Sequence, residues 1–115
     1  MSDCIFCMIA TGEIPTRVVY ENDDVIAFED LNPQTPVHTL IIPKQHYKHI
    51  GDNVPPELLG KLFSAVKDVA AAKGIENSGY RIIVNTGDDA RQTVHHLHIH
   101  LLGGIRLPIR MGPDD

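Results

Sequence analysis

Short apolar runs separated by turn residues dominate the first half of the chain. Residues 18–20, 25–28 and 39–42 are rich in β-branched and aromatic side chains, which favour strands. A polar turn joins the first two runs, whereas two prolines keep residues 30–36 irregular. Pro43 ends the third run. The pattern therefore predicts a hairpin, then a loop, then a buried strand.

A helical period replaces this pattern after Pro55 and Pro56, which stand in the first turn, where a helix tolerates proline. Apolar residues then recur every three or four positions, and Gly74 is placed to end the helix. A shorter helix is predicted over residues 5–10. The face of the long helix that we expect to be buried carries Leu58, Leu59, Leu62, Phe63, Val66, Val69 and Ala70.

Four of the seven histidines stand close together, between residues 95 and 100. Side chains alternate between the two faces of a strand, so His96, His98 and His100 are expected to point to one side. His95 faces away from them and is expected at the surface. The apolar residues that anchor this strand on its other side are Leu97, Ile99 and Leu101.

Adding a strand over residues 80–85 brings the predicted total to five strands. They follow one another mostly without helical crossovers, which favours an antiparallel sheet. The fold class predicted is therefore α+β, with a five-stranded antiparallel sheet, one long helix and a short N-terminal helix. The chain is expected to form a single domain over residues 1–115.

Composition places the chain among ordinary globular proteins. Hydrophobic residues make up 43% and charged residues 22% of its 115 residues, enough for one real core. The net charge of −5, without a basic run, gives no reason to expect nucleic acid as a partner. We see no signal peptide and no apolar stretch of membrane-spanning length, so we expect a cytoplasmic protein without a membrane partner.

The row of histidines has one catalytic interpretation and two plainer ones. A neutral imidazole is a nucleophile when one ring nitrogen faces the electrophile and the other holds its proton against an acceptor. A second imidazole nearby can then protonate a leaving group, which suits phosphoryl or nucleotidyl transfer. The plainer interpretations are a metal site and a set of buried histidines that satisfy one another.

The segment 96–102 reads His-φ-His-φ-His-φ-φ, where φ is apolar. In this motif, and along nearly its whole length, the chain resembles the histidine triad (HIT) family, especially its Hint-like branch of purine nucleoside phosphoramidases. Further segments with similar residues in that branch are Ile14-Pro15, Ala27-Phe28-Glu29-Asp30, Pro36-Val37-His38, Ile42-Pro43-Lys44-Gln45-His46 and Val84-Asn85.

The resemblance implies a catalytic role for four residues. His98 matches the nucleophile that attacks the α-phosphorus and is transiently nucleotidylated. His100 matches the partner that helps to protonate the leaving group, and His38 matches a histidine of the same relay. Thr93 takes the place of a serine or threonine hydroxyl near the leaving group.

The resemblance also implies a purine nucleotide site. Asp30 matches a carboxylate that binds the ribose hydroxyls, Asn85 matches a phosphate-side contact, and Gln92 is placed with the substrate-binding residues. Taken alone, Asp30 is a typical turn residue, and Phe28 and Ile9 are typical core residues. The residues that match the apolar slot for the base are Phe6, Ile9, Ile14, Phe28 and Leu31.

The function implied is hydrolysis of adenosine 5′-phosphoramidates through a nucleotidylated histidine, with no cofactor needed for the chemistry. Gly103-Gly104 after the motif favours the Hint side over a dinucleoside polyphosphate hydrolase. Two functions of a different class stay open: a regulatory nucleotide-binding module with incidental turnover, and a zinc-storage or metal-sensing domain. The resemblance further implies a homodimer with a continuous ten-stranded sheet.

The cysteines, Cys4 and Cys7, form a Cys-x-x-Cys pair near the N-terminus. In a reducing compartment a structural disulfide is not expected, and no strand precedes the pair as a thioredoxin-like motif requires. We therefore rank half of a metal site first, two incidental residues next and a redox pair last. Some relatives with this pair bind zinc, and the resemblance implies a structural Cys₂His₂ zinc site made by Cys4, Cys7, His46 and His96.

Two features depart from the family pattern. Arg91 stands where the branch often has glycine, so it is strained if that position needs a positive φ, or its charge adds a phosphate contact. The tail 105–115 lacks tryptophan and matches the branch poorly, which affects substrate choice most.

Overall fold

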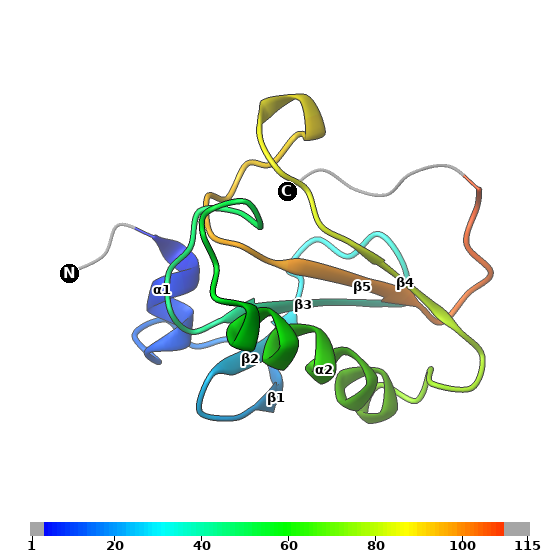
Figure 1. Cartoon of the computed structure of the whole chain (residues 1–115). Helices are drawn as coiled ribbons and strands as arrows, with labels where there is room; N and C mark the ends of the chain where they lie inside the picture. Colours follow the sequence, from blue (N-terminus) through cyan, green and yellow to red (C-terminus); the bar gives the residue numbers. More distant parts are fainter. Residues whose placement is uncertain (1–3, 110–115) are drawn as a thin grey trace.

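The computed structural model describes residues 4–109 as a five-stranded antiparallel sheet flanked by two helices, which confirms the predicted fold class (Figure 1). The strands lie in the order β1-β2-β3-β5-β4. Residues 110–115 of the divergent tail lie outside the described part of the chain. The elements are α1 (Ile5–Ala10), β1 (Val18–Glu21), β2 (Val25–Glu29), β3 (Val37–Pro43), α2 (Pro56–Ala72), β4 (Tyr80–Ile83), η1 (Asp88–Ala90) and β5 (Ile99–Gly103).

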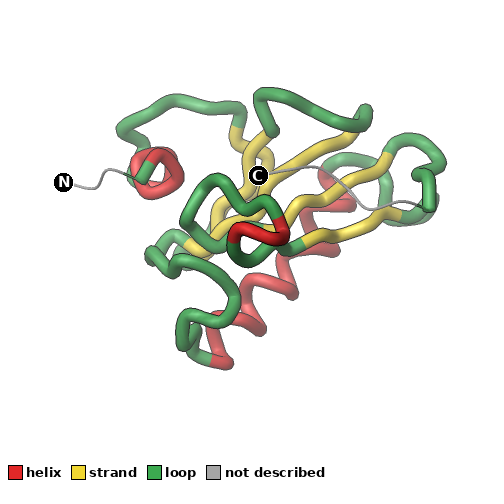
Figure 2. Tube along the Cα trace, turned by 90° about the horizontal axis from the view of Figure 1, so that it is seen from above, coloured by secondary structure: helices red, strands yellow, loops and turns green. Residues whose placement is uncertain are grey.

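The two α-helices cover opposite faces of the sheet. Along β2, Val25 and Ala27 pack in the cluster that includes α2, whereas Ile26 and Phe28 pack in the cluster that includes α1. Side chains alternate between the faces, so a strand covered on both sides must be apolar throughout. Figure 2 shows α2 lying along one side of the sheet and α1 set apart from it. The region beside α1 is where the histidines gather.

The long helix begins and ends where the sequence predicts, but its buried face differs at one large residue. Gly74 has φ +72°, the left-handed conformation that stops a helix. Phe63 is 36% exposed, so the expectation of a buried Phe63 is wrong. Successive residues are 100° apart around a helix, which puts Phe63 on the flank of a face centred on Leu62 and Val66. Neither helix of residues 4–109 is both long enough and apolar enough to cross a bilayer.

The two C-terminal strands are shorter than predicted. β4 ends at Ile83, and β5 begins only at Ile99, so His96 and His98 precede the paired strand. Extending the β3–β5 register would place Leu97 opposite Pro43, which has no N–H to donate. The Leu97 N–H instead donates to the carbonyl of Tyr47 (2.7 Å).

The predicted alternation of side chains survives this early end of pairing. Leu97, Ile99 and Leu101 are all buried in the α2-side cluster. His96 and His98 both contact the ring of Phe6 on the α1 side. The three histidines therefore lie on one face, as predicted, although only His100 lies in β5.

Candidate active site

Three buried histidines from two adjacent strands and the segment before β5 form the centre of the site. His38 lies in β3, His100 lies in β5, and their strands pair directly. The exposed fractions of His38, His98 and His100 are 3%, 2% and 0%. The rings of His98 and His100 lie 5.0 Å apart between centroids. Two of the three histidines are therefore carried on paired strands, and all three are buried.

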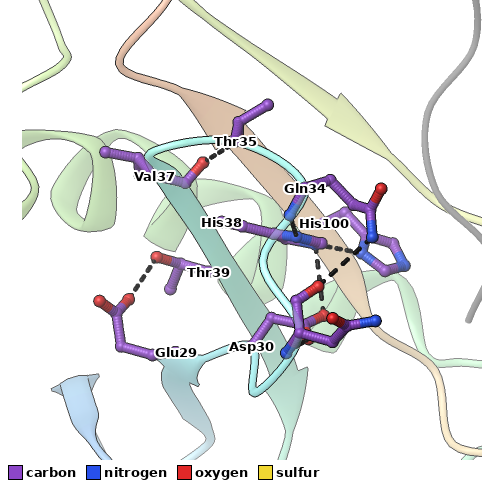
Figure 3. A network of polar contacts seen from close by, with 9 residues as sticks. Glu29, Asp30, Gln34, Thr35, Val37, His38, Thr39 and His100 are labelled. Atoms are coloured by element: carbon purple, nitrogen blue, oxygen red, sulfur yellow. Dashed lines mark hydrogen bonds and ion pairs between the residues drawn. The ribbon is translucent and has the colours of Figure 1, made fainter.

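The hydrogen bonds of His38 fix where its proton lies (Figure 3). The backbone N–H of Gln34 donates to His38 Nδ1 (3.0 Å), so a neutral His38 carries its proton on Nε2. That N–H donates to Nδ1 of His100 (2.9 Å), with Oδ2 of Asp30 3.3 Å away. His100 Nδ1 is then the acceptor, which places the proton of a neutral His100 on Nε2.

His98 has the opposite tautomer. Its Nδ1 lies 2.7 Å from the carbonyl oxygen of His96, which only accepts, so Nδ1 carries the proton. Nε2 of His98 is left with its lone pair, and it is buried without a hydrogen-bond partner among residues 4–109. One nitrogen held against an acceptor and the other open is the arrangement that a nucleophilic imidazole needs.

Burial keeps these imidazoles neutral near pH 7. It lowers the pKa of His38 and His98, and it lowers the pKa of His100 to about 3. The carboxylates of Asp30 and Glu29 oppose this effect on the pKa of His38. The hydrogen bonds of His38, His98 and His100 described above require all three rings to be neutral.

The buried neutral state of His100 predicts a loss of stability in acid. Its pKa falls from 6.5 when unfolded to about 3 when folded, so the unfolded chain binds more protons between these values. The free energy of unfolding should therefore fall as pH drops below 6.5, by about 2 kcal/mol from this group between pH 6.5 and 5. Urea unfolding at both pH values measures it.

A glutamine substitution at His100 separates this contribution from the general effect of acid. His100→Gln should flatten the fall in unfolding free energy, whereas His95→Gln, at an exposed histidine, should not. An equal fall in His100→Gln and the unaltered protein would refute the explanation.

Two carboxylates at the end of β2, Asp30 and Glu29, both raise the pKa of His38. Asp30 is a turn residue, since its Oδ1 accepts the N–H of Asn32 (2.8 Å), but its Oδ2 also faces His38. Glu29 accepts a hydrogen bond from the Thr39 hydroxyl (2.9 Å), and its other oxygen lies 2.6 Å from Nζ of Lys73. Sequence reasoning missed Glu29 and the Gln34 N–H. The second is a backbone group, which no side-chain pattern can reveal.

The structure brings together most of the residues predicted for the base. Phe6, Ile9 and Phe28 are buried in one apolar cluster, and Ile14 packs against it. Burial in a cluster is also what the core interpretation of Phe28 and Ile9 predicts. Leu31 does not join them, because it is 92% exposed in the loop after β2.

The loop before β5 holds the remaining predicted residues. Thr93 is exposed, and Asn85 is half-buried after the end of β4, not within it as predicted. Gln92 is buried, and its amide binds backbone groups of the protein: it accepts from Gly87 N–H and donates to two carbonyls. Arg91 has φ +64°, the left-handed conformation that favours glycine. Of the two alternatives for this position, the structure therefore shows the strained backbone.

A second cluster, made by Cys4, Cys7, His46 and His96, lies beside the histidine site. Nδ1 of His96 is 3.4 Å from Sγ of each cysteine and 3.2 Å from Nδ1 of His46. A tetrahedral zinc site separates neighbouring sulfur and nitrogen donors by about 3.3–3.8 Å. Nε2 of His96 donates to the carbonyl of Pro43 (2.8 Å), so the Nδ1 lone pair faces the thiols. These four residues fit a metal ion.

The group of Asp30, His38 and His100 is also compact enough to hold a metal ion. The tautomer of His38 does not favour metal binding here. The Gln34 N–H puts the His38 proton on Nε2, and a metal ion would need the lone pair of that atom. The cluster of Cys4, Cys7, His46 and His96 is therefore suited to bind a metal ion, whereas Asp30, His38 and His100 are suited to transfer a proton.

Comparison with known proteins gives the family. The HIT domain matches residues 11–107. The chain belongs to the HIT family. This HIT protein is 43% identical over 105 residues to Protein HitA of Neisseria gonorrhoeae, an alignment covering 90% of this chain and 97% of that one. It is 49% identical over 104 residues to an uncharacterised HIT-like protein of Synechococcus elongatus, an alignment covering 89% of this chain and 90% of that one.

Solved structures agree with the fold. A HIT family hydrolase from Legionella pneumophila superposes with a TM-score of 0.91 at 43% identity, covering 96% of this HIT protein and 100% of that chain. A histidine triad protein from Clostridium difficile superposes with a TM-score of 0.90 at 44% identity, covering 96% of this HIT protein and 98% of that chain. The resemblance to the HIT family is thereby confirmed; the Hint-like branch stays a prediction.

Proposed function

We propose that this HIT protein hydrolyses adenosine 5′-phosphoramidates through a nucleotidylated His98. The observation that carries the proposal is the pair of opposite tautomers: His98 presents a lone pair on Nε2, and His100 carries its proton on Nε2. A nucleophile beside a proton donor is what transfer of a nucleotidyl group needs. The name of the Legionella relative, a HIT family hydrolase, supports hydrolysis as the reaction class.

The first half of the reaction follows from these positions. His98 Nε2 attacks the α-phosphorus, and the bond from phosphorus to the amine breaks. The amine takes a proton from His100 Nε2. The relay of His100 and His38 binds this extra proton from solvent together with the anionic substrate, so both imidazoles are neutral, not anionic, once the amine has left. Asp30, with Oδ2 3.3 Å from His38 Nε2, stabilises the positive charge while the extra proton is on the relay. In the second half, water attacks the phosphorus, its proton returns to the relay, and AMP leaves His98.

The substrate-binding assignments remain proposals that the placement of residues supports. The cluster of Phe6, Ile9 and Phe28 offers an apolar wall beside the histidines, and Asp30 offers a carboxylate at the edge of that wall. Thr93 is exposed, lies five residues before His98 and is proposed to contact the leaving group. Asn85 is proposed on the phosphate side.

The test is to trap the intermediate and compare substrates. Rapid quenching with an adenosine phosphoramidate should give a mass increase of one adenylyl group, located on the peptide that contains His98. Faster turnover of diadenosine polyphosphate would favour a dinucleoside polyphosphate hydrolase, and nucleotide binding without an adduct would favour the regulatory module. Absence of the adduct during measurable turnover would exclude the covalent mechanism.

We also propose that the Cys₂His₂ cluster holds a structural zinc ion. The donor types, their separations and the His96 tautomer support it. All four tetrahedral positions are then filled by protein, so the ion supplies fold stability rather than a bound water. The neutral relay needs no metal for the proposed chemistry.

We propose a homodimer that pairs β4 with its copy. β4 is an edge strand of the sheet. The long helix α2 contacts β1, β2 and β3, which lie toward the opposite edge. Tyr80 and Ile82 on this edge are 40% and 38% exposed, which is typical of apolar residues that a partner covers.

A charge on this edge should weaken the dimer. Ile82→Lys is expected to raise the dimer dissociation constant at least about tenfold, since a lysine would be buried without a partner. Sedimentation velocity over a dilution series measures it. Val18→Lys, on the opposite edge strand β1 and 49% exposed, is the matched control and should leave the dimer intact. The reverse result would place the interface at β1.

A further inference from the structure

Phe6 contacts the ring of the proposed nucleophile directly. Its ring lies 5.1 Å from His98 between centroids, at 89°. It also lies 6.0 Å from His96 at 68° and 5.4 Å from Phe28 at 73°. Phe6 is only 6% exposed. The side chain therefore fills the space between the nucleophile and the Cys₂His₂ cluster.

A hydrogen bond and a second ring contact also hold the orientation of the His98 ring. The carbonyl of His96 accepts its Nδ1 proton, and His100 packs at 5.0 Å and 64°. His98 precedes β5, so strand pairing does not fix its backbone. The edge-to-face contact with Phe6 is one of the restraints on the direction of Nε2.

The two cysteines flank Phe6 in the first turn of α1. Cys4 is the N-cap of this helix, and its Sγ accepts a hydrogen bond from the N–H of Cys7 (3.4 Å). The four donor atoms of the cluster lie within 4.8 Å of one another, so the two sulfurs are close. Both cysteines are half-buried, and Cys4 lines an open cleft of about 510 Å³. A small oxidant can therefore reach the pair.

A disulfide between these cysteines would change the geometry of the turn. Cys4 is the N-cap and has extended backbone angles (φ −79°, ψ 118°), so the pair is not held at helical spacing. A disulfide brings the two sulfurs, each now 3.4 Å from His96 Nδ1, to about 2.05 Å from one another, and Phe6 lies in the turn that must adjust. The same bond removes both sulfurs from His96, whose carbonyl holds the His98 proton.

We propose that Phe6 is a positioning residue for His98, and that oxidation of Cys4 and Cys7 to a disulfide withdraws this positioning and slows nucleotidyl transfer reversibly. The proposal rests on the proposed function of the site. Oxidised glutathione is a sufficient oxidant: in the metal-free protein the two thiols lose two electrons and two protons, their S–S bond forms, and the S–S bond of glutathione breaks to give two thiols. Where the cluster holds the proposed zinc ion, the same oxidation starts from two thiolates, the ion is released to solvent, and the two protons of glutathione come from solvent.

The experiment compares the reduced and the oxidised full-length protein, both freed of metal with a chelator, so that the two samples differ in the disulfide and not in zinc content. Alkylation and mass spectrometry establish the disulfide, and quenched single turnovers with an adenosine phosphoramidate give the rate of His98 adduct formation. Oxidation should slow this rate at least about tenfold, and dithiothreitol should restore it. The imidazole Cε1–H resonance of His98 is the second readout; it should shift on oxidation, because the ring current of Phe6 moves away.

Substitutions at Phe6 separate positioning from contact with the base. At saturating substrate, Phe6→Leu should slow adduct formation at least about tenfold and shift the His98 resonance, whereas Phe6→Tyr should restore both. Loss of a base contact alone would raise KM and leave the saturated rate unchanged. Ile42→Val, a buried residue of the same cluster, is the control for packing and should keep the rate.

Two results would overturn the proposal: an unchanged adduct rate in protein with a verified Cys4–Cys7 disulfide, or a His98 resonance that neither oxidation nor Phe6→Leu moves. Failure of the proposed function is distinguishable, because reduced wild-type protein would then form no adduct at all. The resonance measurements need no turnover and still test the positioning of His98 in that case.

Discussion

Replacing His98 by alanine should slow hydrolysis of an adenosine phosphoramidate at least about 10³-fold, the scale on which loss of a covalent nucleophile acts. The expected cause is the loss of a buried imidazole nitrogen that faces the site with an open lone pair. Steady-state kinetics measures the effect. No adenylyl adduct should form in the variant, and affinity for AMP should change less than tenfold, since the apolar wall and Asp30 remain.

His95→Ala is the matched control for this result. It removes an imidazole three residues away, but His95 is exposed and stands outside both histidine clusters, so turnover should stay within about twofold. A thermal melt of each variant verifies that the protein is folded. Retention of more than a tenth of the activity in His98→Ala would contradict the nucleophile assignment.

The sequence was sufficient for the sheet and for the common face of the histidines, because both depend on local periodicity. The alternation of residues 96–101 holds even where strand pairing stops, since Leu97 is anchored in the α2-side core. The point where pairing stops was not predictable from that segment. It depends on Pro43, which lies opposite Leu97 only once the strands are aligned.

The proton positions lie beyond what a sequence reveals. The tautomer of His38 is set by a backbone N–H at Gln34, and that of His98 by the backbone carbonyl of His96. Every residue type except proline carries both groups, so residue type gives no signal. The resemblance could assign a role to each histidine; only the three-dimensional contacts explain why two adjacent rings carry their protons on different nitrogens.

Some patterns are compatible with two environments for one side chain. Phe63 follows the helical period, yet it lies on the flank of the buried face and is exposed. Phe6 matched the base slot, and the structure adds a contact with His98 that no spacing indicates, because the two residues are far apart in the sequence. The Gln92 amide donates to the backbone carbonyls of Lys48 and Val94, and its role in substrate binding stays a prediction.

Loss of the proposed zinc ion should lower the free energy of unfolding by about as much as a large-to-small substitution in the core. Wild-type protein is expected to carry about one zinc per chain, and Cys4→Ser/Cys7→Ser less than a tenth of that, by elemental analysis. An ion present at 1,000 times its dissociation constant adds about 4 kcal/mol to folding, which corresponds to roughly 10–20 °C in the midpoint of thermal unfolding. A strong chelator should lower the midpoint of wild-type protein by that amount.

The double variant provides the internal control for the chelator. Because it lacks both thiolates, its midpoint should already be low and should not fall further on chelation. His49→Ala removes a histidine outside the cluster and should keep both the zinc and the response to chelator. His96→Ala should lose both, since Nδ1 of His96 lies 3.4 Å from each sulfur and its ring is fully buried. A wild-type midpoint that is insensitive to chelation, in protein purified without zinc, would show that the cluster is held by hydrogen bonds alone.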